Sequence, residues 1–184
     1  MMKKWEQKIT YHCAPVLAGV KPSNLVMFSC AECREMWKHL SEYRAELGQR
    51  GIEIRIFSSA GRAMIFIYRP TMLAECLSPT EVQDFLVRHG YERDMELKAS
   101  LDMLAKRIVK AGEFPHEIGI FLGYPLSDVE GFLSSREDFL LCGEWKVYSE
   151  AEKAERLFAL YRDTRQRAVG KTIREMVGAH SASA

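Results

Sequence analysis

Few features of this 184-residue sequence point to a particular compartment or partner. Twenty-six basic residues are balanced by twenty-five acidic ones, so the net charge is only +1. That balance argues against a protein that holds nucleic acid through a concentrated basic surface. No apolar run approaches the roughly 18 to 20 residues of a membrane span. The opening MMKKWEQKIT lacks the apolar core of a secretory signal. We therefore expect a cytoplasmic protein that binds neither nucleic acid nor membrane.

Recognisable catalytic motifs are also missing. The sequence has no Walker loop, dinucleotide fingerprint, HExxH motif or nucleophile elbow. Its five cysteines are expected to be reduced in a cytoplasmic protein. No internal repeat and no linker rich in proline or glycine divides the chain. We predict one domain over residues 1–170 and a C-terminal tail over residues 171–184 that is flexible at its end.

Hydrophobic periodicity predicts alternating strands and helices. Short β-prone runs cover residues 24–29, 52–57 and 64–68, and the last two are spaced as a β-hairpin. Apolar residues three and four apart predict an amphipathic helix over residues 31–47. Capping boxes at Ser78 and Ser149 begin further helices, and another is expected over residues 93–111. Two more strands are predicted at 117–122 and 144–148.

The order of these elements predicts the fold class. It is that of an α/β (α+β) protein, a single domain with a mixed β-sheet of four to five strands and helices on both faces. The first strand, the helix over 31–47 and the second strand are expected to form a right-handed βαβ unit with parallel strands.

The segment PHEIGIFLGYP, residues 115–125, carries a candidate general base. His116 stands at the start of the predicted strand, and neutral histidine accepts a proton near physiological pH. Glu117 follows it directly, but neighbouring residues of a strand point to opposite faces, so Glu117 is not expected to orient His116. The alternative is a histidine that is hydrogen-bonded to backbone at a strand edge.

Cys13 is a candidate nucleophile. It lies in YHCAP, before a short apolar helix whose unpaired N–H groups would lower the pKa of its thiol. With His116 it would form a Cys-His pair of the kind that activates a thiol. The alternative is a small buried side chain, since cysteine is among the residues most often found inside proteins.

Two other motifs have weaker chemical meaning. Cys30 and Cys33 form a CxxC between a strand and a helix, the position of thioredoxin-like redox centres, but the neighbouring aromatic and Gly-Pro residues of that pattern are absent. We expect both to be structural, with Cys33 in the first turn of the helix. Tyr68 and Arg69 end a strand, where a fixed guanidinium would hold a carboxylate or phosphate.

Several segments resemble a known family. HCAPVLAGVKPSNL, PHEIGIFLGYPLSDVEGF and GEWKVY are similar to the domain of unknown function 3793, small proteins of anaerobic bacteria, over about residues 10–165. The resemblance implies no established reaction, but it implies a shared site. Its residues are His12, Cys13, Lys21, Tyr68, Arg69, His116, Glu117, Tyr124 and Lys146. Locally, residues 116–123 also resemble the HVGIYLG strand of NlpC-type cysteine peptidases, with His116 and Cys13 in the catalytic roles.

Three hypotheses of function follow. The first is an enzyme with Cys13 as nucleophile, His116 as its base and Glu117 as a further catalytic candidate. The remaining site residues would then bind an anionic small molecule: His12, Lys21, Tyr68, Arg69, Tyr124 and Lys146. The second is a non-catalytic ligand- or metal-binding adaptor of iron or redox metabolism that uses the same cluster. The third is a structural interaction protein. No cofactor, metal or protein partner is assigned.

Overall fold

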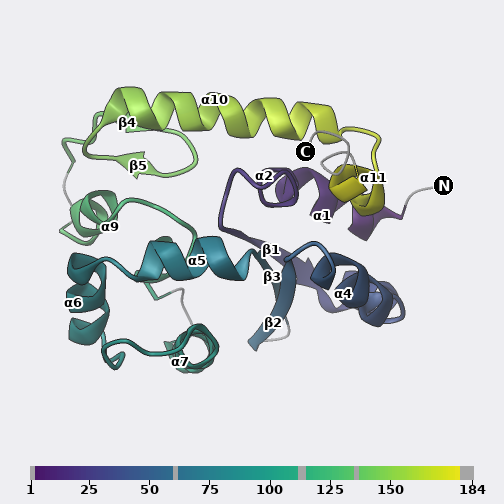
Figure 1. Cartoon of the computed structure of the whole chain (residues 1–184), viewed down its shortest axis with the longest axis horizontal. Helices are drawn as coiled ribbons and strands as arrows, with labels where there is room; N and C mark the ends of the chain where they lie inside the picture. The colour runs from purple at the N-terminus through teal and green to yellow at the C-terminus, as the bar shows by residue number, and fades with distance from the viewer. Residues whose placement is uncertain (1–2, 60–61, 112–114, 135–136, 179–184) are drawn as a thin grey trace. The chain divides into compact units, whose positions relative to one another are not determined.

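The computed structural model describes residues 3–59, 62–111, 115–134 and 137–178. They form an α+β structure with two small sheets (Figure 1). The chain divides into two compact units, Met1–Pro70 with Tyr161–Ala184 (unit 1) and Thr71–Leu160 (unit 2). The expectation of a single domain therefore stays a prediction, and each unit is described by itself. Within the described residues, none of the helices combines the length and apolar character that crossing a membrane requires.

Unit 1 contains a three-stranded sheet. Strands β1 (Ser23–Ser29), β2 (Glu53–Ser59) and β3 (Arg62–Tyr68) lie in the order β1-β3-β2, and both pairings are antiparallel. The predicted hairpin of β2 and β3 is confirmed. The predicted mixed sheet of four to five strands is not confirmed, because the described residues form one sheet of three strands and one of two, with antiparallel pairings.

The composition of β3 explains the order of the strands. β3 is almost entirely apolar, with Ile65, Phe66 and Ile67 fully buried, which suits a central strand covered on both faces. β2 alternates charged and apolar residues (EIRIFSS) and suits an edge. β1 and β2 therefore run parallel to each other with β3 between them. The predicted parallel direction of these two strands is confirmed, but they are not neighbours in the sheet.

Short helices pack against one face of this sheet. They are α1 (Lys4–His12), α2 (Ala14–Leu17), α3 (Cys30–Trp37), α4 (Leu40–Gly48) and α11 (Ile173–Gly178). The helix predicted over residues 31–47 is divided into α3 and α4. Helix α11 falls in the region expected to be a tail, where Ile173, Met176 and Val177 are buried in the core of unit 1.

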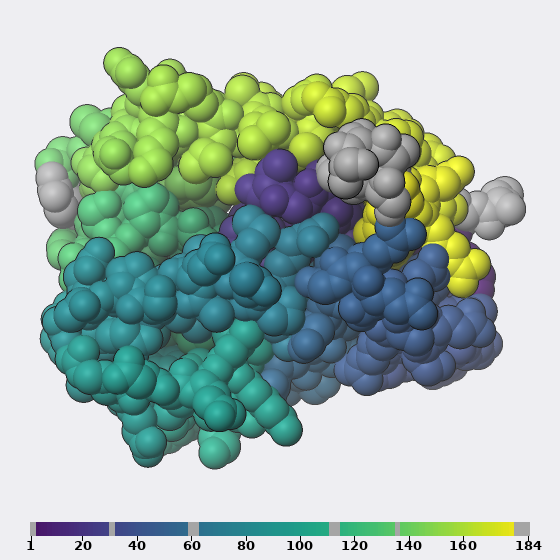
Figure 2. All heavy atoms as spheres, in the orientation of Figure 1, coloured from purple at the N-terminus to yellow at the C-terminus, as the bar shows by residue number. Residues whose placement is uncertain are grey.

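Unit 2 is mainly helical, and Figure 2 shows one face of α5–α7 in teal. Its elements are α5 (Pro70–Leu77), α6 (Thr80–Arg88), α7 (Leu97–Ala111), α8 (Ile118–Phe121), α9 (Leu126–Leu133), β4 (Leu141–Cys142), β5 (Lys146–Val147) and the start of α10 (Ala151–Ala168). β4 and β5 pair antiparallel, with Cys142 opposite Lys146. The strand predicted at 144–148 is thus reduced to two residues.

The strand predicted at 117–122 is wrong, because this segment forms the helical turn α8. The N–H groups of Ile118 and Gly119 donate to the carbonyl oxygens of Pro115 and His116, at 3.0 and 3.2 Å. Gly123 then ends the turn with a φ of 79°, a conformation that suits glycine. A short apolar run such as residues 118–122 is compatible with either a strand or a buried helical turn, so periodicity alone could not distinguish them.

Candidate functional site

A pocket of about 420 Å³ lies within unit 2. Its volume falls in the range of small-molecule sites, roughly 300 to 1,000 Å³. It contains three of the residues expected from the sequence: His116, Tyr124 and Lys146. The complete lining is Pro115, His116, Ile118, Gly119, Tyr124, Asp128, Val129, Phe132, Glu144, Trp145 and Lys146. We call this the His116 pocket.

Three neighbouring segments of chain build the pocket. The turn α8 and its flanks provide His116 and Tyr124, helix α9 provides Phe132, and the turn between β4 and β5 provides Trp145. Gly119 allows α8 to approach α9 closely. A Cβ atom on Gly119 would lie 2.8 Å from Cγ2 of Val129, which is too short for a real contact.

Asp128, in the first turn of α9, fixes the turn between β4 and β5. Its side chain is buried, and Oδ2 accepts a hydrogen bond from the indole Nε1–H of Trp145 at 2.7 Å. Oδ1 accepts from the backbone N–H groups of Tyr148 and Ser149, at 2.8 and 3.1 Å. A buried carboxylate with three donors is well satisfied, so Asp128 holds the pocket wall in one arrangement.

Aromatic rings contribute to that wall. The rings of Tyr124 and Trp145 are stacked, with centroids 4.7 Å apart, and Phe158 meets Trp145 edge-on at 4.6 Å. The ring of His116 lies 5.8 Å from that of Phe132. These separations are typical of favourable aromatic pairs. Phe132 is 49% exposed, so much of its ring faces outward from the packed protein.

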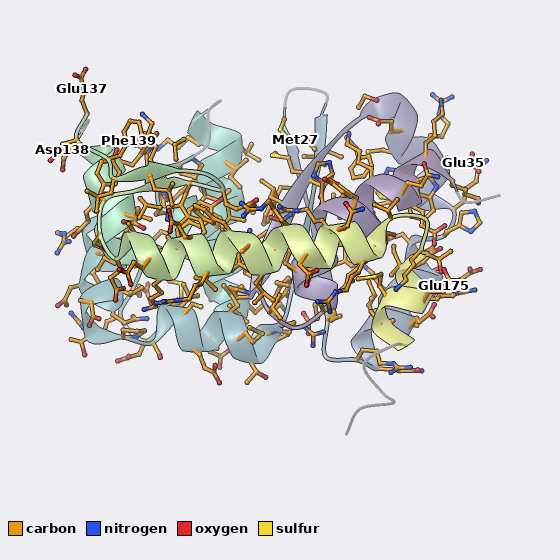
Figure 3. The ribbon with its side chains drawn as sticks, turned by 90° about the horizontal axis from the view of Figure 1, so that it is seen from above. Met27, Glu35, Glu137, Asp138, Phe139 and Glu175 are labelled. Carbon is orange, nitrogen blue, oxygen red and sulfur yellow. The ribbon has the colours of Figure 1, made fainter. Side chains whose placement is uncertain are left out.

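Charged groups lie beside these rings. The side chains of His116 and Lys146 are exposed. The Lys146 ammonium lies 5.1 Å from the ring centroid of Phe139, a residue that Figure 3 labels on the segment before β4. Glu144 is half-buried, and its backbone carbonyl accepts a 3.4 Å hydrogen bond from the hydroxyl of Tyr124. The mouth of the pocket therefore carries both signs of charge, and Lys146 is more exposed than Glu144.

Glu117 has a different environment. Only 1% of its side chain is exposed, and it accepts hydrogen bonds from Nε of Arg107 and, at 3.3 Å, from the hydroxyl of Tyr91. Burial and the neighbouring Glu117 carboxylate raise the pKa of Tyr91. Glu117 does not line the His116 pocket. These contacts connect α7 to α8, so they give Glu117 a structural task.

Cys13 is fully buried in unit 1. Burial raises the pKa of its thiol to about 12, and the nearby Lys21 and Asn24 oppose this only in part. This rise in pKa is opposite to the lower pKa that was expected for a thiol at a helix N-terminus. The helix that follows, α2, has only four residues, and its Pro15 has no N–H to offer. The alternative, a small buried side chain, fits this environment.

The neighbours of Cys13 form a buried polar cluster. Lys21 is 2% exposed, and its ammonium donates to Oδ1 of Asn24 at 3.0 Å and lies 5.6 Å from the ring centroid of Tyr161. The amide of Asn24 in turn donates to the backbone carbonyl of His12 at 2.6 Å. The side chain of His12 is itself exposed. A binding role for Lys21 and His12 stays a prediction.

Tyr68 and Arg69 contact groups of unit 1. Arg69 donates from Nε to the carbonyl of Val16 at 2.7 Å and from Nη2 to that of Leu17 at 3.0 Å. It therefore satisfies carbonyl groups at the end of α2, and burial lowers its pKa. The hydroxyl of Tyr68 donates to Glu53 at 2.5 Å. That both residues hold an anion stays a prediction.

The predicted pairing of Cys13 with His116 is not tested, because Cys13 belongs to unit 1 and His116 to unit 2. Cys33 is buried within α3, and the side chain of Cys30 lies outside the described part of the structure. Among the described residues, no group of three or more histidine, cysteine, aspartate or glutamate side chains is arranged to hold a metal ion.

Comparison with known proteins identifies the family. The family model described as protein of unknown function (DUF3793) matches residues 9–178. The chain belongs to this family. No curated protein and no solved structure matches it. The local resemblance to NlpC-type peptidases is not supported, since the segment that resembled their strand is the turn α8.

Proposed function

We propose that this protein of the DUF3793 family binds a small molecule in the His116 pocket, without covalent catalysis. One observation carries the proposal. The pocket joins an aromatic interior of adequate volume to a few polar groups at its mouth, which is the usual composition of a ligand site. The network around Asp128 supports it further, because a wall that is held before binding lowers the entropic cost of binding.

The environment of Cys13 favours binding over the Cys-His enzyme. The thiolate is the nucleophilic form of cysteine, and a thiol with a pKa of about 12 is protonated at neutral pH. Its full burial also denies a substrate access to the sulfur. The enzyme hypothesis would need a state of unit 1 in which Cys13 is exposed and ionised. The ligand-binding alternative needs no such change.

Nuclear magnetic resonance of the three tryptophan indole N–H groups tests the proposal. Trp145 lines the pocket, whereas Trp5 and Trp37 belong to unit 1 and serve as internal controls. A library of small anionic, neutral and cationic compounds is titrated into the full chain. We expect a compound to shift the Trp145 signal in a saturable manner while the signals of Trp5 and Trp37 change little.

Two variants locate the binding. Phe132 lines the pocket, and Leu140 is an exposed apolar residue of the same unit outside the lining. Phe132→Ala should weaken binding roughly 2- to 12-fold, the worth of one aromatic contact. Leu140→Ala should leave the affinity unchanged. The proposal is wrong if no compound shifts Trp145, or if both variants bind like the wild type.

A further inference from the structure

We infer that the ligand of the His116 pocket is a planar aromatic compound that carries an anionic group, such as an aromatic carboxylate. The inference rests on the proposed function and adds the chemical class of the ligand. Two independent features carry it. One is the type of surface that the ligand would touch, and the other is the distribution of charge around the opening.

The surface favours a flat ring over an aliphatic chain. Side chains with planar π-systems reach the pocket from each of its three segments: His116 and Tyr124, then Phe132, then Trp145. Aromatic rings attract one another in stacked and edge-to-face arrangements, and this attraction adds to the free energy gained by burying apolar area. An aliphatic ligand of equal volume would gain only the area term.

Tyr124 and Trp145 are already paired with each other, so they present a preformed wall. Phe132, by contrast, is half-exposed, and its ring has room for a further partner. The ring of His116 lies near that of Phe132 at 5.8 Å. A ligand ring placed against Phe132 would therefore bring its substituents close to His116.

The charges around the opening favour an anionic substituent. Two carboxylates line the pocket, but both oxygens of Asp128 accept hydrogen bonds from the protein. The second carboxylate, that of Glu144, belongs to a half-buried residue. The exposed groups at the rim are Lys146, whose ammonium is a cationic hydrogen-bond donor, and His116, whose ring carries an N–H donor. A ligand anion would pair with these groups at the rim.

Four probes separate the two features. Naphthalene-2-carboxylate has a flat ring and an anion. Naphthalene-2-carboxamide keeps the ring and the size and removes the charge, whereas decahydronaphthalene-2-carboxylate keeps the charge and removes the flat ring. Naphthalen-2-ylmethylammonium reverses the charge. Each is titrated into the full chain by calorimetry, with the Trp145 indole signal as the reporter of position.

The expected order is definite. The aromatic carboxylate should bind about five-fold or more tightly than the amide, as expected for a charge-assisted hydrogen bond near a surface. It should bind roughly 2- to 12-fold more tightly than the saturated carboxylate, and the cation should bind most weakly. The advantage over the amide should shrink as salt is added, because exposed charges are screened.

Lys146→Met and Lys98→Met form a matched pair. Both lysines are exposed in unit 2, and only Lys146 lines the pocket. Lys146→Met should remove most of the difference between carboxylate and amide and leave the affinity for the amide nearly unchanged. Lys98→Met should leave both affinities as in the wild type.

The outcomes distinguish this inference from the proposed function. If the amide, the cation or the saturated compound binds as well as the aromatic carboxylate at Trp145, the ligand class is wrong and the pocket remains a binding site. The same holds if library compounds shift Trp145 and none of the four probes does. If no compound of any kind shifts Trp145, both the inference and the proposed function are wrong.

Discussion

The carboxylate of Asp128 and the indole of Trp145 are joined by a 2.7 Å hydrogen bond across 17 residues of sequence. Both side chains are buried, and the other oxygen of Asp128 accepts from two backbone N–H groups beyond β5. One side chain thereby connects α9 to both the aromatic wall and the backbone that follows it. This carboxylate therefore fixes part of the wall of the His116 pocket.

Replacing Asp128 should therefore destabilise the protein. Asp128→Ala leaves the indole N–H of Trp145 and the backbone N–H groups without their acceptor, at a cost of roughly 2 to 4 kcal/mol in the free energy of unfolding. Urea denaturation followed by circular dichroism measures the loss. Glu130→Ala is the control, since Glu130 makes an exposed ion pair with Arg88, and it should cost less than about 1 kcal/mol. Equal costs for the two variants would contradict the role of Asp128.

Gly119 should be required for the approach of α8 to α9. Alanine normally favours a helix over glycine by up to about 1 kcal/mol. Here the added Cβ would meet Cγ2 of Val129 at 2.8 Å and Cδ2 of Tyr124 at 3.2 Å. We expect Gly119→Ala to lose about 1 to 3 kcal/mol by overpacking.

A second substitution tests the cause of that loss. Val129→Ala removes the methyl group that the new Cβ would meet, so the double variant should lose less than the two single losses added together. Thermal or urea denaturation of the four proteins gives the coupling free energy. Strict additivity would show that the strain does not come from Val129.

The sequence predicted local features better than long-range ones. The hairpin of β2 and β3 depends on neighbouring residues and the loop between them, and such signals are short-range. The position of β3 between β1 and β2 depends on which strands pair, which is a long-range property. The apolar composition of β3 was the only local feature of the sequence that indicated it. The turn α8 was missed because a short apolar run suits either a strand or a buried helical turn.

The site shows the same limit. His116, Tyr124 and Lys146 were expected and line one pocket. Three lining residues were not predicted to be functional: Asp128, Phe132 and Trp145. An acidic residue in the first turn of a helix is usually explained by its favourable interaction with the helix dipole. A tryptophan in an alternating apolar pattern is usually assigned to the core. Nothing in the spacing of Asp128 and Trp145 indicates that they meet. Only the fold of unit 2 brings them together.

Stability above neutral pH should depend on Cys13. Burial raises its pKa to about 12 in the folded state, whereas an unfolded thiol ionises near about 8.5. Between these values the unfolded chain binds fewer protons than the folded one, so the contribution is complete below about pH 8 and falls as the pH rises toward 12. Its slope is at most about 1.4 kcal/mol per pH unit.

A comparison with Cys13→Ala isolates this effect, because the other titrating groups cancel in the difference. The free energy of unfolding of the wild type minus that of the variant should decrease steadily between about pH 8.5 and about pH 10.5. Urea melts at several pH values measure it. A difference that stays constant over this range would mean that Cys13 ionises equally well in both states.

The last prediction concerns His116 and decides between a binding residue and the base of a Cys-His pair. Its side chain is exposed and contacts Phe132, whereas Ile120, in the middle of α8, is 2% exposed. His116→Gln should therefore lose less than about 1.5 kcal/mol of stability. Ile120→Ala should lose roughly 2 to 5 kcal/mol by leaving a cavity.

The reactivity of Cys13 completes this test. A fully buried thiol reacts only through opening of the structure, so alkylation of Cys13 should be much slower than that of the exposed Cys142. Mass spectrometry at about pH 6 and pH 8 gives both rates in the wild type and in His116→Gln. We expect the two Cys13 rates to agree, because the ligand-binding proposal gives His116 no part in activating the thiol. A Cys13 that reacts faster than Cys142 near pH 6, and loses that advantage in His116→Gln, would establish the Cys-His pair and overturn the proposal of binding without covalent catalysis.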